Sequence, residues 1–196
     1  HSDYGRQGGV NPMLGLASGG PFMAAEVPLG AATTVSLGMT EQHLDHDNAA
    51  FRSDADRAAY RGVGDLDANA LTLRMTHRAS PNLTFNTSWA RVRERNSLLG
   101  VQSRQRSDLS HGAVTDTLTV ASTLKVNQGF TLAVAATAGR TNSSGAPEQG
   151  FTTGDDVLST SFAVSASFRN VVGRGDALRL SVTQPFHVER GELLYA

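Results

Sequence analysis

Apolar and polar residues alternate one by one along several stretches of this chain. The pattern is clearest in the second half, where four runs place apolar side chains at every second position, with threonine, serine or alanine between most of them. The runs cover residues 117–126, 130–139, 161–168 and 178–183. Alternation with a period of two is typical of β-strands that present one apolar and one polar face.

The first half carries the same pattern less clearly. Residues 35–39, 71–76 and 83–89 alternate in this way, and residues 13–25 hold one more run that Gly19, Gly20 and Pro21 interrupt. The sequence therefore predicts about eight strands, several of them about ten residues long, which is the length at which a tilted strand crosses a bilayer.

The connections between these runs alternate between short and long. Short turns are predicted at residues 28–32, 80–82, 127–129 and 170–176, and long polar loops at 43–69, 93–114 and 141–156. A meander across a membrane produces this alternation, whereas a sandwich with Greek-key crossings does not require it. We therefore expect residues 1–196 to form a single all-β region, an antiparallel up-and-down transmembrane β-barrel that is a fragment of a longer barrel. A soluble β-sandwich is the alternative.

Backbone hydrogen bonding decides how such strands are arranged in lipid. Lipid offers no hydrogen-bond partners, so a spanning sheet must close on itself, with its apolar side toward the hydrocarbon. The opposite side, made of small residues together with Arg74 and Arg179, then lines or fills the interior. Aromatic residues near strand ends are expected at the membrane interfaces: Trp89, Phe130, Phe168 and Phe186.

Composition narrows the possible functions. The 17 basic and 18 acidic residues nearly cancel, so nothing points to a nucleic-acid partner. The absence of cysteine excludes disulfides and thiolate metal sites. The chain contains no run of about 18 apolar residues, so its sequence predicts no membrane-spanning helix. The chain starts at His1 with no initiator methionine or signal peptide, and we expect it to be a piece of something longer.

Several stretches resemble a known family. They read Asn-Pro-Met-Leu-Gly-Leu-Ala at 11–17, Arg-Glu-Arg-Asn-Ser-Leu-Leu-Gly at 93–100, Gly-Phe-Thr-Leu at 129–132, Ala-Gly-Arg-Thr at 138–141 and, as the most specific, Ser-Val-Thr-Gln-Pro-Phe at 181–186. Together they resemble the C-terminal barrel region of subtilisin-like (S8 family) autotransporter serine proteases of Gram-negative bacteria. Two features depart from that family: the chain ends in Tyr195-Ala196 rather than in an aromatic residue, and the family's barrel runs further.

The resemblance implies an outer-membrane anchor at the bacterial cell surface that helps to translocate a passenger. Its partners would be outer-membrane lipid, its own N-terminal passenger domain and the barrel assembly machinery, with no cofactor. Catalysis would belong to the passenger, because the Gly-Thr-Ser-Met-Ala nucleophile segment of the protease is absent here. The alternatives are a stand-alone small outer-membrane barrel acting as porin, adhesin or lipid-binding protein, and a soluble β-rich binding domain.

Two groups of side chains are candidate sites. His43, Asp45, His46 and Asp47 could hold Zn²⁺ or Ca²⁺ if their loop folded suitably, although a solvated loop has the same composition. A second group consists of arginines at and beyond a strand end: Arg91, Arg93, Arg95, Arg104 and Arg106. Guanidinium groups pair with lipopolysaccharide phosphates, and the alternative is a charged loop neutralised by Glu94 and Asp108.

Three further motifs favour structural readings. A hydrolytic triad of His43, Asp47 and Ser110 has no support from spacing. Ser122 and Lys125 match a Ser-x-x-Lys pattern, but an odd spacing on a strand puts them on opposite faces. The Arg-Gly-Asp sequence at 174–176 has the composition of a turn before a strand.

Overall fold

The chain folds as a long antiparallel β-sheet. The computed structural model describes residues 21–44, 66–95, 112–143, 151–153, 156–171, 173, 175–191 and 193–195. The eight strands of the main sheet, in their order across it, are β1 (Phe22–Pro28), β2 (Thr33–Leu44), β3 (Leu66–Ser80), β4 (Leu83–Arg95), β5 (Ala113–Lys125), β6 (Phe130–Ser143), β8 (Val157–Arg169) and β9 (Ala177–Arg190). Within these residues no helix is long and apolar enough to cross a membrane.

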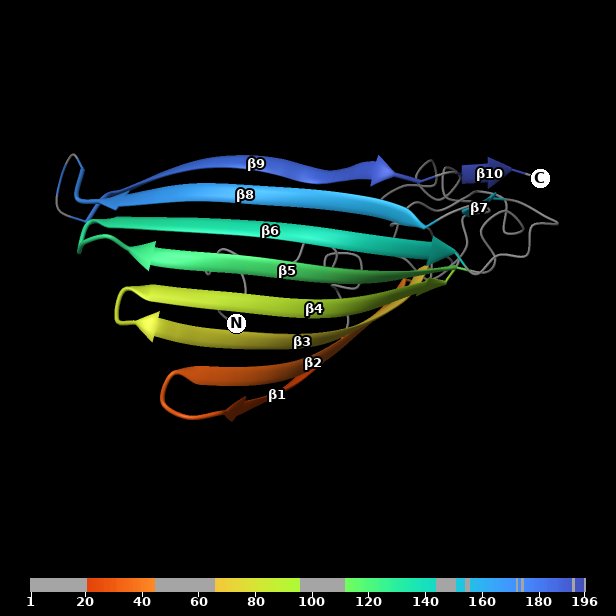
Figure 1. Ribbon diagram of the computed structural model, residues 1–196, viewed down its shortest axis with the longest axis horizontal. Coiled ribbons are helices and arrows are strands. Elements are labelled where there is room, and N and C mark those ends of the chain that lie inside the picture. The colour runs from red at the N-terminus through yellow and green to blue at the C-terminus, as the bar shows by residue number, and fades with distance from the viewer. Residues whose placement is uncertain are drawn as a thin grey trace, which may run out of the picture.

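Each long strand lies beside the next long strand in the sequence, so the sheet is an up-and-down meander (Figure 1). The connections β1–β2, β3–β4, β5–β6 and β8–β9 gather at one end of the sheet, which we call the turn end. The opposite end, from which the other connections leave, is the loop end. The predicted all-β, antiparallel, up-and-down arrangement of about eight strands is confirmed, and these eight form one sheet rather than the two facing sheets of a sandwich.

The sheet is open, and β1 and β9 form its two edges. The first strand differs from the prediction: β1 spans Phe22–Pro28, later than the expected run at 13–25, of which residues 13–20 lie outside the described residues. Two short strands, β7 (Phe151–Thr153) and β10 (Leu193–Tyr195), pair with each other near the loop end and were not predicted. Three residues are too few for alternation to reveal a strand.

Local side chains stabilise the predicted turns. Ser80 Oγ accepts hydrogen bonds from the backbone N–H groups of Asn82 (3.2 Å) and Leu83 (3.1 Å). Asn127 Oδ1 accepts one from Gly129 (2.8 Å), closing the β5–β6 turn. Such contacts explain why serine and asparagine mark turns in the sequence. The strands also continue a few residues into the predicted long loops, because pairing of β2 with β3 extends to Leu44 and Leu66.

An unbroken register fixes the face on which each side chain lies. Pairing from β2 to β8 runs without a shift except near the β3–β4 turn, between Arg78 and Ser80. The pairing of β8 with β9 contains two shifts, between Leu158 and Ser159 and between Thr160 and Phe162. Each shift adds a residue to β9 and reverses the faces of the residues beyond it.

One consequence concerns Phe186, which was expected at a membrane interface. Instead its ring lies over Gly139 on the opposite face, where a Cβ on Gly139 would come within 2.8 Å of Phe186 Cζ. The register shift between Thr160 and Phe162, opposite Gln184 to His187 of β9, accounts for this position. A similar pair occurs near the other edge, where Phe22 lies over Gly38 at 3.3 Å from a built Cβ. Both glycines make room for an aromatic ring.

We expect Gly139→Val to destabilise the fold by about 1–3 kcal/mol, because the added methyl groups would overlap the Phe186 ring. Denaturant unfolding of the two proteins measures the difference. Gly173→Val is the matched control, because the space around Gly173 is open. Combining Gly139→Val with Phe186→Ala should cost less than the sum of the two single changes. A cost no larger than that of the control would contradict this packing.

Candidate functional site

The two faces of the sheet differ sharply in chemistry, and together they form the most distinctive feature of the molecule. One face carries the large apolar residues, and we call it the apolar face. Its most exposed members leave between 40% and 71% of their surface accessible: Met23, Val27, Leu37, Met39, Leu73, Met75, Phe85, Leu118, Val120, Val134, Leu158, Phe162, Leu178, Leu180 and Val182. A soluble protein rarely leaves so many neighbouring apolar side chains uncovered.

The opposite face, which we call the small-residue face, consists mostly of alanine, serine, threonine and glycine. In its central strands this face is the buried one: Ala90, Val92 and Thr115 have no accessible surface. The predicted position of Arg74 on this face is confirmed, and its guanidinium donates to Asn86 Oδ1 at 2.9 Å. Arg179 also lies on this side, with its guanidinium 3.5 Å from Ser165 Oγ.

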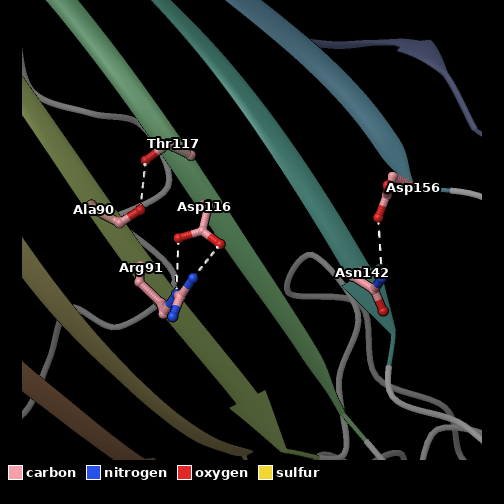
Figure 2. Close-up of polar contacts among 6 residues, drawn as sticks. All are labelled: Ala90, Arg91, Asp116, Thr117, Asn142 and Asp156. Atoms are coloured by element: carbon pink, nitrogen blue, oxygen red, sulfur yellow. Dashed lines mark hydrogen bonds and ion pairs between the residues drawn. The ribbon is translucent and has the colours of Figure 1, made fainter.

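Buried hydroxyl groups on the small-residue face bond to one another across the strands. Thr115 and Thr141 hydroxyls lie 2.9 Å apart, as do those of Thr119 and Thr137. Thr117 Oγ1 donates to the Ala90 carbonyl at 3.2 Å (Figure 2). These bonds give the buried hydroxyl groups the partners that buried polar groups need. Among the described residues, the buried apolar side chains are alanines and two valines.

Charged side chains cross the apolar face near the loop end. Arg91 on β4 lies directly opposite Asp116 on β5, and its Nε and one terminal nitrogen each donate to the carboxylate at 2.9 Å (Figure 2). The Arg91 guanidinium also lies 5.6 Å from the centre of the Trp89 ring. This bidentate pair, together with the ring contact, holds the Arg91 guanidinium group at the border between the apolar and the charged part of the face.

A second ion pair, between Arg140 and Asp156, lies beside the Arg91–Asp116 pair, because Arg140 is opposite Asp116. We call these four side chains the charged row. Asp156, just before β8, accepts a hydrogen bond from Arg140. It also accepts one from Asn142 Nδ2 at 3.0 Å (Figure 2). Both donors stabilise the ionised carboxylate, first Arg140 and then Asn142, and they hold the pKa of Asp156 below its ordinary value. The sequence did not reveal these partners, because Arg140 and Asp156 come together only through the pairing of β6 with β8.

The candidate arginines separate into two groups. Arg91, Arg93 and Arg95 occupy alternate positions of β4, so all three lie on the apolar face at its loop end. Arg104 and Arg106 lie outside the described residues. Glu94, weighed as a neutralising partner, lies on the small-residue face and is buried, with 3% of its surface accessible. Asp116 is the acid that pairs with Arg91 instead.

The candidate metal ligands are only partly described. His43 forms a short contact with Asp67 on the neighbouring strand, an acid that the sequence analysis did not include. Asp45, His46 and Asp47 lie outside the described residues. Among the residues that the structure does describe, no group of three histidine or carboxylate side chains is placed to hold a metal ion.

The remaining motifs take structural roles or include residues outside the described part of the chain. Ser122 pairs with Phe85 and Val134 on the apolar face, whereas Lys125 falls on the other face, so they form no catalytic pair. Asp176 of the Arg-Gly-Asp sequence accepts backbone bonds from Val171 (2.8 Å) and Gly173 (3.0 Å) within its turn. Asp47 and Ser110 of the hypothetical triad lie outside the described residues.

The predicted interface aromatics form a contact at the turn end. Phe130 and Phe168, opposite each other on β6 and β8, stack with ring centres 4.8 Å apart.

No family model, curated protein or solved structure matches this chain. The described part of the chain is an all-β sheet whose eight strands form one antiparallel meander, apolar on one face and small and polar on the other.

The lowered pKa of Asp156 gives a pH-dependent contribution to stability. The contribution should be complete above the pKa of an unfolded aspartate and should be lost as the pH falls through the lower pKa of the folded state. Asp156→Asn should therefore destabilise the protein at neutral pH and have little effect at strongly acidic pH, as measured by denaturant unfolding at both. Arg140→Gln should raise the Asp156 pKa in an NMR titration. An Asp156 pKa that Arg140→Gln leaves unchanged would contradict the assignment.

Proposed function

We propose that this chain spans a bacterial outer membrane as part of a β-barrel and anchors a passenger domain at the cell surface. The observation that carries the proposal is the distribution of side chains. Large apolar residues cover the exposed face, and small or hydroxyl-bearing residues occupy the other. In water this distribution leaves apolar surface unburied, whereas in lipid it places each face in a suitable environment.

The dimensions of the apolar face agree with this proposal. Its uncharged part runs from Leu118 on β5 to Val126, the residue that follows this strand, and from Leu158 to Phe168 on β8. At about 3.3 Å per residue these segments are about 26 and 33 Å long, and a strand tilt of about 40° reduces them to about 20 and 25 Å. The apolar band of an outer-membrane barrel is about 25 Å tall.

The ends of the sheet also support a membrane location. Trp89 lies next to the charged row at the loop end, and the Phe130–Phe168 stack lies at the turn end. Aromatic rings collect at the two borders of a membrane because one side of the ring can meet lipid and the other the polar headgroups. A shallow apolar groove lies on this face between Trp89 and the Phe130–Phe168 stack. The small side chains of Ala136 and Ala138 form its floor between Leu118 and Phe162, and its shape suits an acyl chain.

The passenger and the barrel assembly machinery enter the proposal through the resemblance to S8-family autotransporters. A meander of long strands with all its short turns at one end is the arrangement that such a barrel would need. An antiparallel sheet of this kind suits a non-catalytic role, and any hydrolysis would belong to a passenger.

A stand-alone barrel of eight strands acting as porin, adhesin or lipid-binding protein is the second candidate, favoured by the number of strands in the sheet.

Neighbouring positions on β9 allow a direct test of the membrane location. Val182 lies on the apolar face and Ser181 on the small-residue face, and both are exposed. With Trp89→Phe as background, a tryptophan reporter is introduced as Val182→Trp or as Ser181→Trp. After refolding into phosphatidylcholine vesicles with brominated acyl chains, the fluorescence of the first variant should be strongly quenched and that of the second much less. Equal quenching, or none in either variant, would exclude this orientation.

The anchoring role needs a separate test. A folded reporter domain preceded by a signal peptide is fused in front of residues 1–196 and expressed in a Gram-negative host. We expect the reporter to reach the cell surface, where external protease removes it from intact cells. A fusion to an outer-membrane protein of known surface display is the positive control. Efficient membrane insertion with the reporter left in the periplasm would favour the stand-alone barrel instead.

A further inference from the structure

Basic residues in the described strands are sorted by face and by end. On the apolar face, the arginines of β4 and β6 lie at the loop end: Arg91, Arg93, Arg95 and Arg140. At the turn end the lysine and the arginines of the described strands belong to the small-residue face: Arg78, Lys125, Arg169 and Arg179. Among the described residues, the apolar face therefore presents arginine beyond one of its two borders, the one at the loop end.

Two of these arginines are already neutralised. Arg91 pairs with Asp116, and Arg140 pairs with Asp156. Arg93 is different, because its cross-strand neighbours are Asn69 on β3 and Val114 on β5. Arg95 faces Asp67, but that carboxylate contacts His43. Within the described part of the chain, neither Arg93 nor Arg95 takes part in an ion pair, and both are exposed.

We infer that Arg93 and Arg95 bind the phosphate of an anionic lipid headgroup on the loop side of the membrane. The inference deepens the proposed function and rests on it. Alternate residues of a strand lie about 6.6 Å apart on one face, so two guanidinium groups can reach one phosphate from adjacent positions. Guanidinium groups bind phosphate through paired hydrogen bonds.

The position of the two arginines selects a lipid over a free phosphate. Trp89 and Arg91 mark the border of the apolar band, and Arg93 and Arg95 follow directly beyond it on the same strand. A headgroup phosphate occupies this level when the acyl chains of its lipid lie against the apolar face. Because the turn end of that face offers no such arginine among the described residues, the preference for anionic lipid should be confined to the loop side.

The single tryptophan of the chain provides the measurement, because Trp89 lies four residues before Arg93 on the same face. The full chain is refolded into vesicles that mix unlabelled phosphatidylcholine with brominated phosphatidylcholine or brominated phosphatidylglycerol. Quenching of Trp89 then gives the relative affinity of the two lipids at this position. We expect a several-fold preference for phosphatidylglycerol, which should weaken at high salt.

Variants then assign the preference to the two residues. Replacing both by glutamine (R93Q, R95Q) should reduce the preference by roughly fivefold for each charge removed, up to its complete loss. The matched control removes two cations from the small-residue face at the turn end (R78Q, K125Q) and should leave the preference unchanged. A reporter moved to the turn end of the apolar face, as Trp89→Phe with Phe130→Trp, should show no preference.

The outcomes separate this inference from the proposed function. If neither brominated lipid quenches Trp89 in the unaltered chain, the membrane location itself fails. If both quench equally, the chain faces lipid but Arg93 and Arg95 select no headgroup, and the inference is overturned without any variant. A preference that survives R93Q and R95Q, or that free inorganic phosphate abolishes at millimolar concentration, would also overturn it.

Discussion

Antiparallel pairing is the constraint on which every other property of this molecule depends. The pleat sends successive side chains to opposite faces, so the pairing register decides which residues meet and which environment each one enters. From β2 to β8 the register carries Leu37, Leu73 and Leu118 into one continuous row across the apolar face. A slip of one residue in a single strand would place threonines in that row and apolar side chains among the buried hydroxyls.

The same constraint explains how a sheet with a polar buried face can be stable. In a soluble protein, burying large apolar residues supplies most of the favourable free energy, about 1.5–3 kcal/mol for each side chain. Here residues such as Leu180 and Val182 remain exposed, while Thr115 and Thr141 are buried and bonded to each other. The apolar face would gain that free energy only in an apolar surrounding, and this is the physical basis of the proposed membrane location.

The ion pairs at the loop end matter more for their position than for their strength. The Arg91 and Asp116 side chains are 42% and 35% exposed, and pairs of this kind contribute little to stability. Their effect is to give Arg91 and Arg140 a carboxylate partner, which Arg93 and Arg95 lack among the described residues. The Asp116 carboxylate holds Arg91 against Trp89, whereas Arg93 lies between Asn69 and Val114 and forms no ion pair within the described residues.

The amino-acid sequence alone determined those features that depend on neighbours along the chain. Alternation assigned the faces of β5, β6 and most of β8, and Ser80, Asn127 and Asp176 marked turns because their side chains bond to backbone groups a few residues away. The pairings of Arg91 with Asp116 and of His43 with Asp67, and the position of Phe186 over Gly139, came only from the tertiary structure. These contacts join residues 24 to 47 positions apart, and a register shift between Gln184 and His187 of β9 decides the last of them. Neither a cross-strand neighbour nor a bulge leaves a signal in local alternation, because both depend on how separate strands align.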